Sequence, residues 1–78
     1  MSKILLFTAP WCTACTALKT TLADEDIEVI NIDHEEGMTI EYGIRTIPTL
    51  IKVDEEGKPI SVTNGNMSLE AFKKWAGE

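Results

Sequence analysis

The stretch FTAPWCTAC, residues 7–15, holds both cysteines of the 78-residue chain, separated by two residues. It continues from Lys3–Thr8, whose unbroken apolar centre predicts a strand buried on both faces. It leads into a helix predicted over Thr13–Ala23. One apolar face of that helix is expected to carry Ala14, Cys15, Leu18 and Leu22. A Cys-x-x-Cys pair where a strand gives way to a helix is a strong signal of redox chemistry.

The two cysteines occupy unequal places in this arrangement. Cys12 falls at the start of the helix, where unpaired amides and the positive end of the helix dipole favour a thiolate. The thiolate is the form that attacks a disulfide. Cys15 lies one turn further, on the inner face, within reach of the first sulfur. The spacing therefore predicts that Cys12 forms a mixed disulfide and that Cys15 resolves it.

The sequence favours two other roles for the pair less. A structural disulfide would close a loop so short that it removes little chain entropy. Structural zinc usually needs four Cys or His ligands, and the chain offers only Cys12, Cys15 and His34. A zinc site shared between two chains stays open, but no metal site is predicted within one chain. His34, in an acidic loop, is expected to be a solvated histidine.

The rest of the chain alternates strands and helices. A second strand is predicted over Glu28–Ile32, and the nineteen residues before it suit a right-handed crossover to a parallel strand. The later elements are predicted as a helix over Glu35–Tyr42, strands over Thr49–Val53 and Pro59–Thr63, and a last helix capped by Ser68. The prediction is an α/β fold, β-α-β-α-β-β-α, with one four-stranded mixed sheet flanked by helices. Residues 1–78 are expected to form a single domain.

Charge and hydropathy narrow the partners. Seven Lys and Arg face thirteen Asp and Glu, a net charge of −6, which disfavours a nucleic-acid binder. Eight Asp and Glu residues, and no Lys or Arg, lie between Lys19 and Arg45. This indicates a solvated face that also repels anionic partners. The longest apolar run, Ile4–Phe7, is too short for a membrane span or a signal peptide. We expect a cytoplasmic protein, without a membrane partner and most simply a monomer.

Three blocks of the sequence together resemble the thioredoxin family over nearly the whole chain. The first is PWCTAC at residues 10–15, and the second is NID at 31–33 followed by YGIRTIPTL at 42–50. The third is Gly65, ahead of the last helix. The resemblance implies a minimal thioredoxin fold of glutaredoxin size, with Cys12 as nucleophile and Cys15 as resolving thiol.

The resemblance also implies where a substrate docks. Pro48 would follow a cis peptide bond that turns the backbone of Ile47 toward the cysteines, and an extended substrate segment would pair with it as an added strand. A flat, nearly uncharged docking surface, with Met67 at its margin, is implied around these positions. Its substrate-binding residues are expected to be Trp11, Thr46, Ile47, Pro48 and Gly65.

The chain departs from the family pattern in three places. The first strand and helix of full-length thioredoxins do not precede residue 3, and Thr13-Ala14 replaces the usual residues between the cysteines. Thioredoxins carry a buried Asp six residues before the first cysteine, where this chain has Leu6. The proton acceptor for Cys15 is therefore left open, between the Cys12 thiolate and a water, and so is the reduction potential.

Three functions follow, in order of preference. The first is reduction of protein disulfides through a Cys12–Cys15 dithiol/disulfide cycle, without a cofactor, with electrons from a thioredoxin-reductase-like donor or glutathione. The second is a glutathione-coupled glutaredoxin, for which Arg45 is the nearby cation, although no Lys lies among residues 7–11 before Cys12. The third is a thioredoxin-fold binding module, or a metal carrier, in which the cysteines serve no catalysis.

Overall fold

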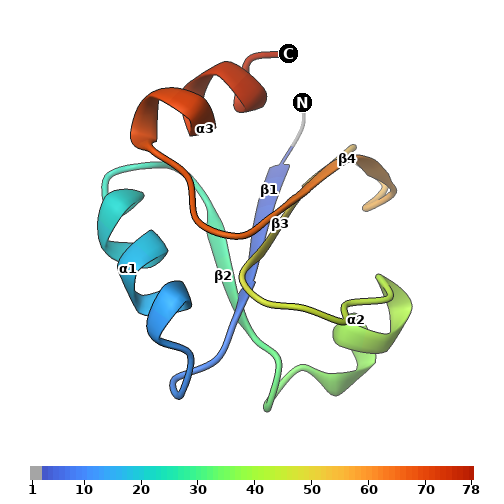
Figure 1. The fold of residues 1–78 in the computed structure, drawn as a ribbon. Coiled ribbons are helices and arrows are strands. Elements are labelled where there is room, and N and C mark those ends of the chain that lie inside the picture. The colour runs from blue at the N-terminus through green and yellow to red at the C-terminus, as the bar shows by residue number, and fades with distance from the viewer. Residues whose placement is uncertain (1–2) are drawn as a thin grey trace.

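Four strands form one mixed sheet in the computed structural model, which describes residues 3–78 (Figure 1). They are β1 (Lys3–Thr8), β2 (Glu28–Asn31), β3 (Thr49–Val53) and β4 (Pro59–Asn64). In the order β2-β1-β3-β4, β1 runs parallel to β2 and antiparallel to β3, and β4 runs antiparallel to β3. The predicted α/β class and four-stranded mixed sheet are confirmed, and the strand that begins with Pro59 lies at the edge.

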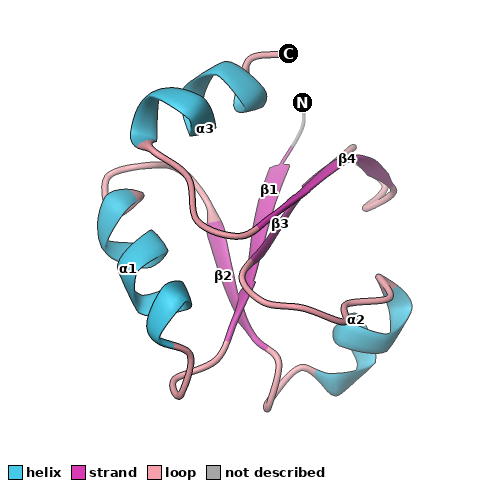
Figure 2. Cartoon of the chain, in the orientation of Figure 1, coloured by secondary structure: helices cyan, strands magenta, loops and turns pink. Residues whose placement is uncertain are grey.

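Three helices cover the sheet on both faces. They are α1 (Thr13–Thr21), α2 (Glu36–Glu41) and α3 (Leu69–Ala76). Figure 2 shows α1 and α3 on one side of the strands and α2 on the other. α2 is shorter than predicted, because Tyr42 closes its last turn and Gly43, at φ +64°, turns the chain away. No helix within residues 3–78 is long and apolar enough to cross a membrane.

β1 is the strand that both halves of the core share. Its side chains alternate between the two faces of the sheet. Leu5 and Phe7 point to the α2 side, where the buried cluster continues with Ile30, Ile51 and Val53. Leu6 points to the α1 and α3 side, where the buried cluster continues with Leu18, Leu22, Leu50 and Phe72. Thr8, two residues after Leu6, therefore continues the α1 side of the strand.

The apolar faces of two helices differ slightly from the prediction. The buried line of α1 runs through Cys15 and Leu18, while Ala14 is only half-buried because it lies at the rim of the first turn. In α3, Phe72 is buried as expected, but Leu69 in the first turn lies at the margin of the core and is 37% exposed. The predicted cap is present, since the Ser68 hydroxyl accepts the Ala71 N–H at 3.1 Å.

Candidate active site

Cys12 is the N-cap of α1. Its backbone is extended, with φ −95° and ψ 108°, and its Sγ accepts the backbone N–H of Cys15 at 3.2 Å. Its own N–H donates to the carbonyl of Ala9 at 3.1 Å, which fixes the tight turn out of β1. The sulfur therefore lies at the N-terminal end of the helix, where the Cys15 amide donates to it.

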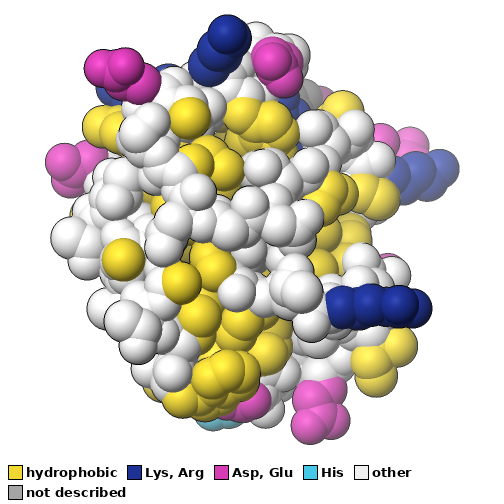
Figure 3. Space-filling view, in the orientation of Figure 1, with side chains coloured by type: hydrophobic (Ala, Val, Ile, Leu, Met, Phe, Trp, Pro, Cys, Tyr) yellow, Lys and Arg dark blue, Asp and Glu magenta, His cyan; other side chains and the backbone are white. Residues whose placement is uncertain are grey.

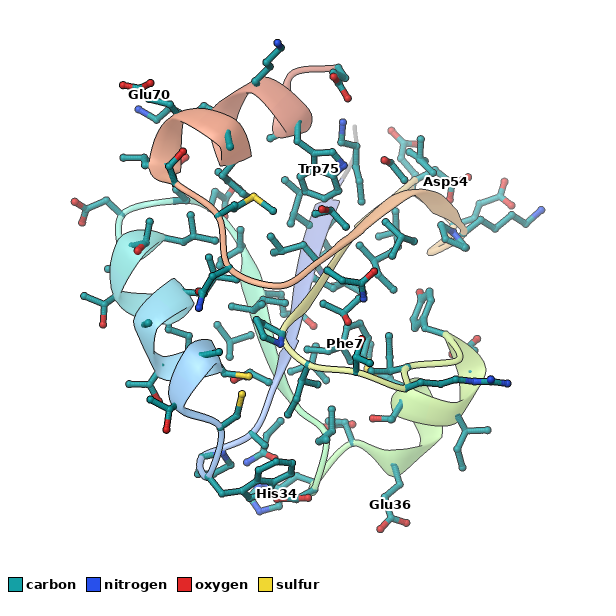
Figure 4. The ribbon with its side chains drawn as sticks, in the orientation of Figure 1. Phe7, His34, Glu36, Asp54, Glu70 and Trp75 are labelled. Atoms are coloured by element: carbon teal, nitrogen blue, oxygen red, sulfur yellow. The ribbon has the colours of Figure 1, made fainter. Side chains whose placement is uncertain are left out.

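Cys15 is fully buried, whereas Cys12 is half-buried, and both are free thiols. Figure 4 shows two sulfur atoms together at the start of α1, in front of the sheet. Burial raises the pKa of the Cys15 thiol above its ordinary value of 9.0, and the hydrogen bond with Cys12 raises this pKa further. The Thr8 hydroxyl and the Ala9 backbone act in the opposite direction on the same pKa. The geometry places a reachable sulfur beside a shielded one.

Trp11 is the exposed neighbour of the cysteine pair. Its ring is 68% exposed, and its indole Nε1 donates to Asp33 Oδ2 at 3.0 Å. Asp33 is held in turn, because its N–H donates to Asn31 Oδ1 at 2.9 Å. His34 lies at this end of the molecule and is exposed (Figure 4). No three His, Cys, Asp or Glu side chains within residues 3–78 are grouped to hold a metal ion.

The loop before β3 lies beside the cysteines. The Ile47–Pro48 peptide bond is cis. The Pro48 carbonyl accepts the Gly65 N–H at 2.9 Å, and Gly65 has φ +82°. The N–H and C=O of Ile47 make no hydrogen bond with the part of the chain that the structure describes. Ile47 therefore presents a free donor and a free acceptor of the kind that an added strand uses.

The residues expected at the docking surface are not equally accessible. Trp11 and Thr46 are exposed, and Ile47 and Gly65 are half-buried. Pro48 differs from the expectation, because it is buried. Figure 3 shows hydrophobic side chains gathered on this face between the start of α1 and the loop before β3, with few charged groups among them. Much of the accessible surface on this face is thus apolar, with few charges.

A polar network that the sequence reasoning missed holds this loop. Asn64 Nδ2 donates to Thr46 Oγ1 at 3.2 Å and to Thr49 Oγ1 at 2.9 Å. Thr49 Oγ1 donates to the Thr46 carbonyl at 2.6 Å. Asn64 therefore ties β4 to the loop that carries Ile47. Its place as the last residue of an edge strand was the signal available.

Comparison with known proteins agrees with this geometry. A family model described as Thioredoxin matches residues 2–78. The chain belongs to the thioredoxin family. It is 32% identical to a thioredoxin of Methanocaldococcus jannaschii over 80 aligned positions, which cover 92% of this chain and 93% of that protein.

Solved structures show the same thioredoxin fold. The germline-specific thioredoxin Deadhead of Drosophila melanogaster superposes with a TM-score of 0.82 at 20% identity, over 97% of this chain and 79% of that one. A mutant thioredoxin from Halobacterium salinarum superposes with a TM-score of 0.79 at 29% identity, over 95% of this chain and 70% of that one. Membership of the thioredoxin family, together with the Cys12–Cys15 pair at the start of α1, supports thiol–disulfide oxidoreductase activity.

Proposed function

We propose that this thioredoxin reduces disulfides in proteins, with Cys12 as the nucleophile and Cys15 as the resolving thiol. The observation that carries the proposal is the asymmetry of the pair. Cys12 is only half-buried and its Sγ accepts the Cys15 N–H at 3.2 Å, while Cys15 is fully buried. An external disulfide therefore meets Cys12 first, and Cys15 reacts only with a sulfur already bound to Cys12.

The cycle has two exchange steps. The Cys12 thiolate attacks one sulfur of the substrate disulfide, forms a mixed disulfide with it, and releases the other substrate sulfur as a thiolate that takes a proton from water. Cys15 then attacks Cys12 Sγ, forms the Cys12–Cys15 disulfide and releases the remaining substrate sulfur as a thiol. Two electrons pass from the protein to the substrate, and an external dithiol or reductase restores them.

Docking is supported by the backbone of Ile47. Its free N–H donates to an extended substrate segment laid beside the loop, and its free C=O accepts from that segment. The exposed faces of Trp11 and Thr46 border this segment, and the left-handed backbone of Gly65 leaves room for its approach, because nothing lies within 4 Å of the position of a Cβ there. Hydrogen bonds to backbone atoms do not depend on the substrate's side chains, which suits a reductase of many proteins.

Two versions of this function differ in the electron donor, which is either a thioredoxin-reductase-like protein or glutathione. A thioredoxin-reductase-like protein is the donor we favour, because the surface around the cysteines is apolar and nearly uncharged. Glutathione carries carboxylates, and Arg45, exposed in the loop before Thr46, is the cation that supports the glutathione-coupled alternative.

The test follows insulin reduction by the wild type, Cys12→Ser and Cys15→Ser, with dithiothreitol, glutathione or a thioredoxin reductase as donor. We expect Cys12→Ser to abolish reduction and Cys15→Ser to accumulate a mixed disulfide with insulin, visible by mass spectrometry. Glutathione-driven activity that survives Cys15→Ser would favour the glutathione-coupled reaction. A wild type as inactive as the double serine variant would overturn the proposal and leave a binding module.

A further inference from the structure

The hydroxyl of Thr8 is buried without a partner. Thr8 is 2% exposed, and its Oγ1 makes no hydrogen bond with any residue of the described part of the chain. Of the buried side-chain oxygens and nitrogens in residues 3–78, it is the one left unpaired. A buried hydroxyl without a partner costs free energy, so its presence in the central strand calls for a role.

The backbone fixes where this hydroxyl points. Thr8 is the last residue of β1, paired with Asn31 of β2, and its carbonyl accepts the Ile32 N–H at 2.9 Å. β1 is therefore hydrogen-bonded to β2 through its last residue. Side chains two positions apart on a strand share a face, so Thr8 points toward α1, as Leu6 does. Leu6 packs deeper, against Leu18 and Leu22, so Thr8 lies nearer the first turn of α1.

Cys15 is the buried residue in the first turn of α1. The hydroxyl lies close enough to lower the pKa of that thiol, although burial and Cys12 outweigh it. Cys12 is the one titratable group within residues 3–78 that shifts the same pKa, and no buried carboxylate does so. The side chain of Leu6 has no polar atom that could donate to the Cys15 sulfur. A donor for the Cys15 sulfur must therefore come from Thr8 or from the Ala9 backbone.

We propose that Thr8 is a positioning residue, whose hydroxyl donates a hydrogen bond to the Cys15 sulfur as that sulfur attacks the mixed disulfide on Cys12. The inference rests on the proposed resolving role of Cys15. In the step, the Cys15–Cys12 S–S bond forms and the bond from Cys12 to the substrate sulfur breaks. The Cys15 proton leaves, and the departing substrate sulfur ends as a thiol. Thr8 keeps its own proton, and the negative charge that develops on Cys15 meets a donor already aimed at it.

The test resolves the two steps with 4,4′-dithiodipyridine, which releases one chromophoric thione when Cys12 attacks and a second when Cys15 resolves. Thr8→Val removes the hydroxyl and keeps the shape of the side chain, whereas Thr8→Ser keeps the hydroxyl. We expect Thr8→Val to slow the second phase about tenfold, to move its pH profile to higher pH, and to leave the first phase unchanged. Thr8→Ser should restore the second phase.

Controls separate this inference from the function beneath it. Thr63→Val removes a hydroxyl from the same face of the sheet, opposite Leu50, and should change neither phase. If Thr8→Val does not fold, Thr8→Ala is compared with Thr8→Ser, because these two side chains differ only in the hydroxyl. Equal second phases in either pair overturn the role of Thr8. Two outcomes would overturn the proposed function itself: a wild type that shows no second phase, or a Cys15→Ser variant that still shows one.

Discussion

The indole Nε1 of Trp11 donates a hydrogen bond to the carboxylate of Asp33 at 3.0 Å, across 22 positions of sequence. Trp11 follows β1 and Asp33 follows β2, and these parallel strands end at the same edge of the sheet. The bond holds an exposed ring beside Cys12 that would otherwise turn freely. Asp33 therefore acts on the docking surface from a separate loop.

We expect Asp33→Ala to raise the KM for a protein disulfide about three- to tenfold, as the loss of one hydrogen bond would. The unfolding free energy should change little, because both side chains are exposed. Kinetics of insulin reduction give the KM, and the indole N–H signal of Trp11 by NMR reports the lost bond. Glu36→Ala, which removes an exposed acid of α2, is the matched control. A KM equal to that of this control would show that the bond does not shape docking.

Asn64 offers a separate test of the loop that carries Ile47. Asn64→Ala removes the donors to Thr46 and Thr49, so the loop should move more while the cysteines stay in place. We expect a several-fold higher KM for a protein disulfide, and an unchanged rate of Cys12 with a small disulfide. Asn66→Ala is the control, because Asn66 makes no hydrogen bond with another described residue. An equal slowing of both substrates would contradict a docking role for the network.

Lys52 is a stability determinant that can be tested by urea unfolding. It is 4% exposed in β3, and its Nζ donates at 3.0 Å to the carbonyls of Trp75 and Glu78 and lies 5.4 Å from the Trp75 ring. Replacing this cation by Met keeps the stem and leaves the carbonyls at the end of α3 without their donor. We expect Lys52→Met to lower the unfolding free energy by about 2 kcal/mol.

Lys58→Met is the control for that experiment. Lys58 is exposed and its 3.6 Å contact with Glu56 is a surface pair, worth little. The two variants lose the same charge and gain the same side chain, so the difference between them measures burial and the contacts with α3. Equal unfolding free energies would mean that water replaces those contacts without cost.

The raised pKa of Cys15 predicts a pH dependence of stability in the reduced protein. The unfolded chain releases the Cys15 proton at the ordinary pKa, 9.0, whereas the folded protein holds it to higher pH. The folded state thus binds more protons between the two pKa values, and the stabilising contribution, complete below pH 9, is lost as pH rises. We expect the unfolding free energy of the wild type to fall more steeply above pH 9 than that of Cys15→Ala.

Urea unfolding between pH 7 and pH 10.5 measures this difference, and the variant cancels the contributions that the two proteins share. The oxidised wild type is a second control, because its disulfide has no thiol proton to lose. Parallel curves for the reduced wild type and Cys15→Ala would show that burial does not hold the proton.

Much of the fold could be predicted because local patterns agree with burial. The apolar run of β1 predicted a strand covered on both faces, and Leu5 and Leu6 do lie in opposite clusters. Ser68 marked the start of the last helix through its ordinary capping role. Lys52 could not be placed in this way, since a lysine in a strand normally faces water. Its burial depends on where the last turn of α3 ends, which no local pattern states.

In the candidate site, too, features set by local sequence could be predicted and features set by tertiary packing could not. Cys12 and Cys15 were predicted from their spacing, because one helical turn alone sets their relation. The bond from Trp11 to Asp33 joins two loops, and the isolation of the Thr8 hydroxyl depends on how α1 packs over β1. These are tertiary relations, which the order of residue types does not encode locally.

The free N–H and C=O of Ile47 lie on a different segment from the two sulfurs of α1. In the proposed mechanism, the backbone hydrogen bonds to the substrate and the reactivity of the thiols are thus properties of separate parts of the chain. A change of side chain in the loop before β3 alters which proteins are retained without retuning either thiol. A change in the first turn of α1 alters the chemistry while the repertoire of partners is kept. The two properties can therefore be engineered one at a time.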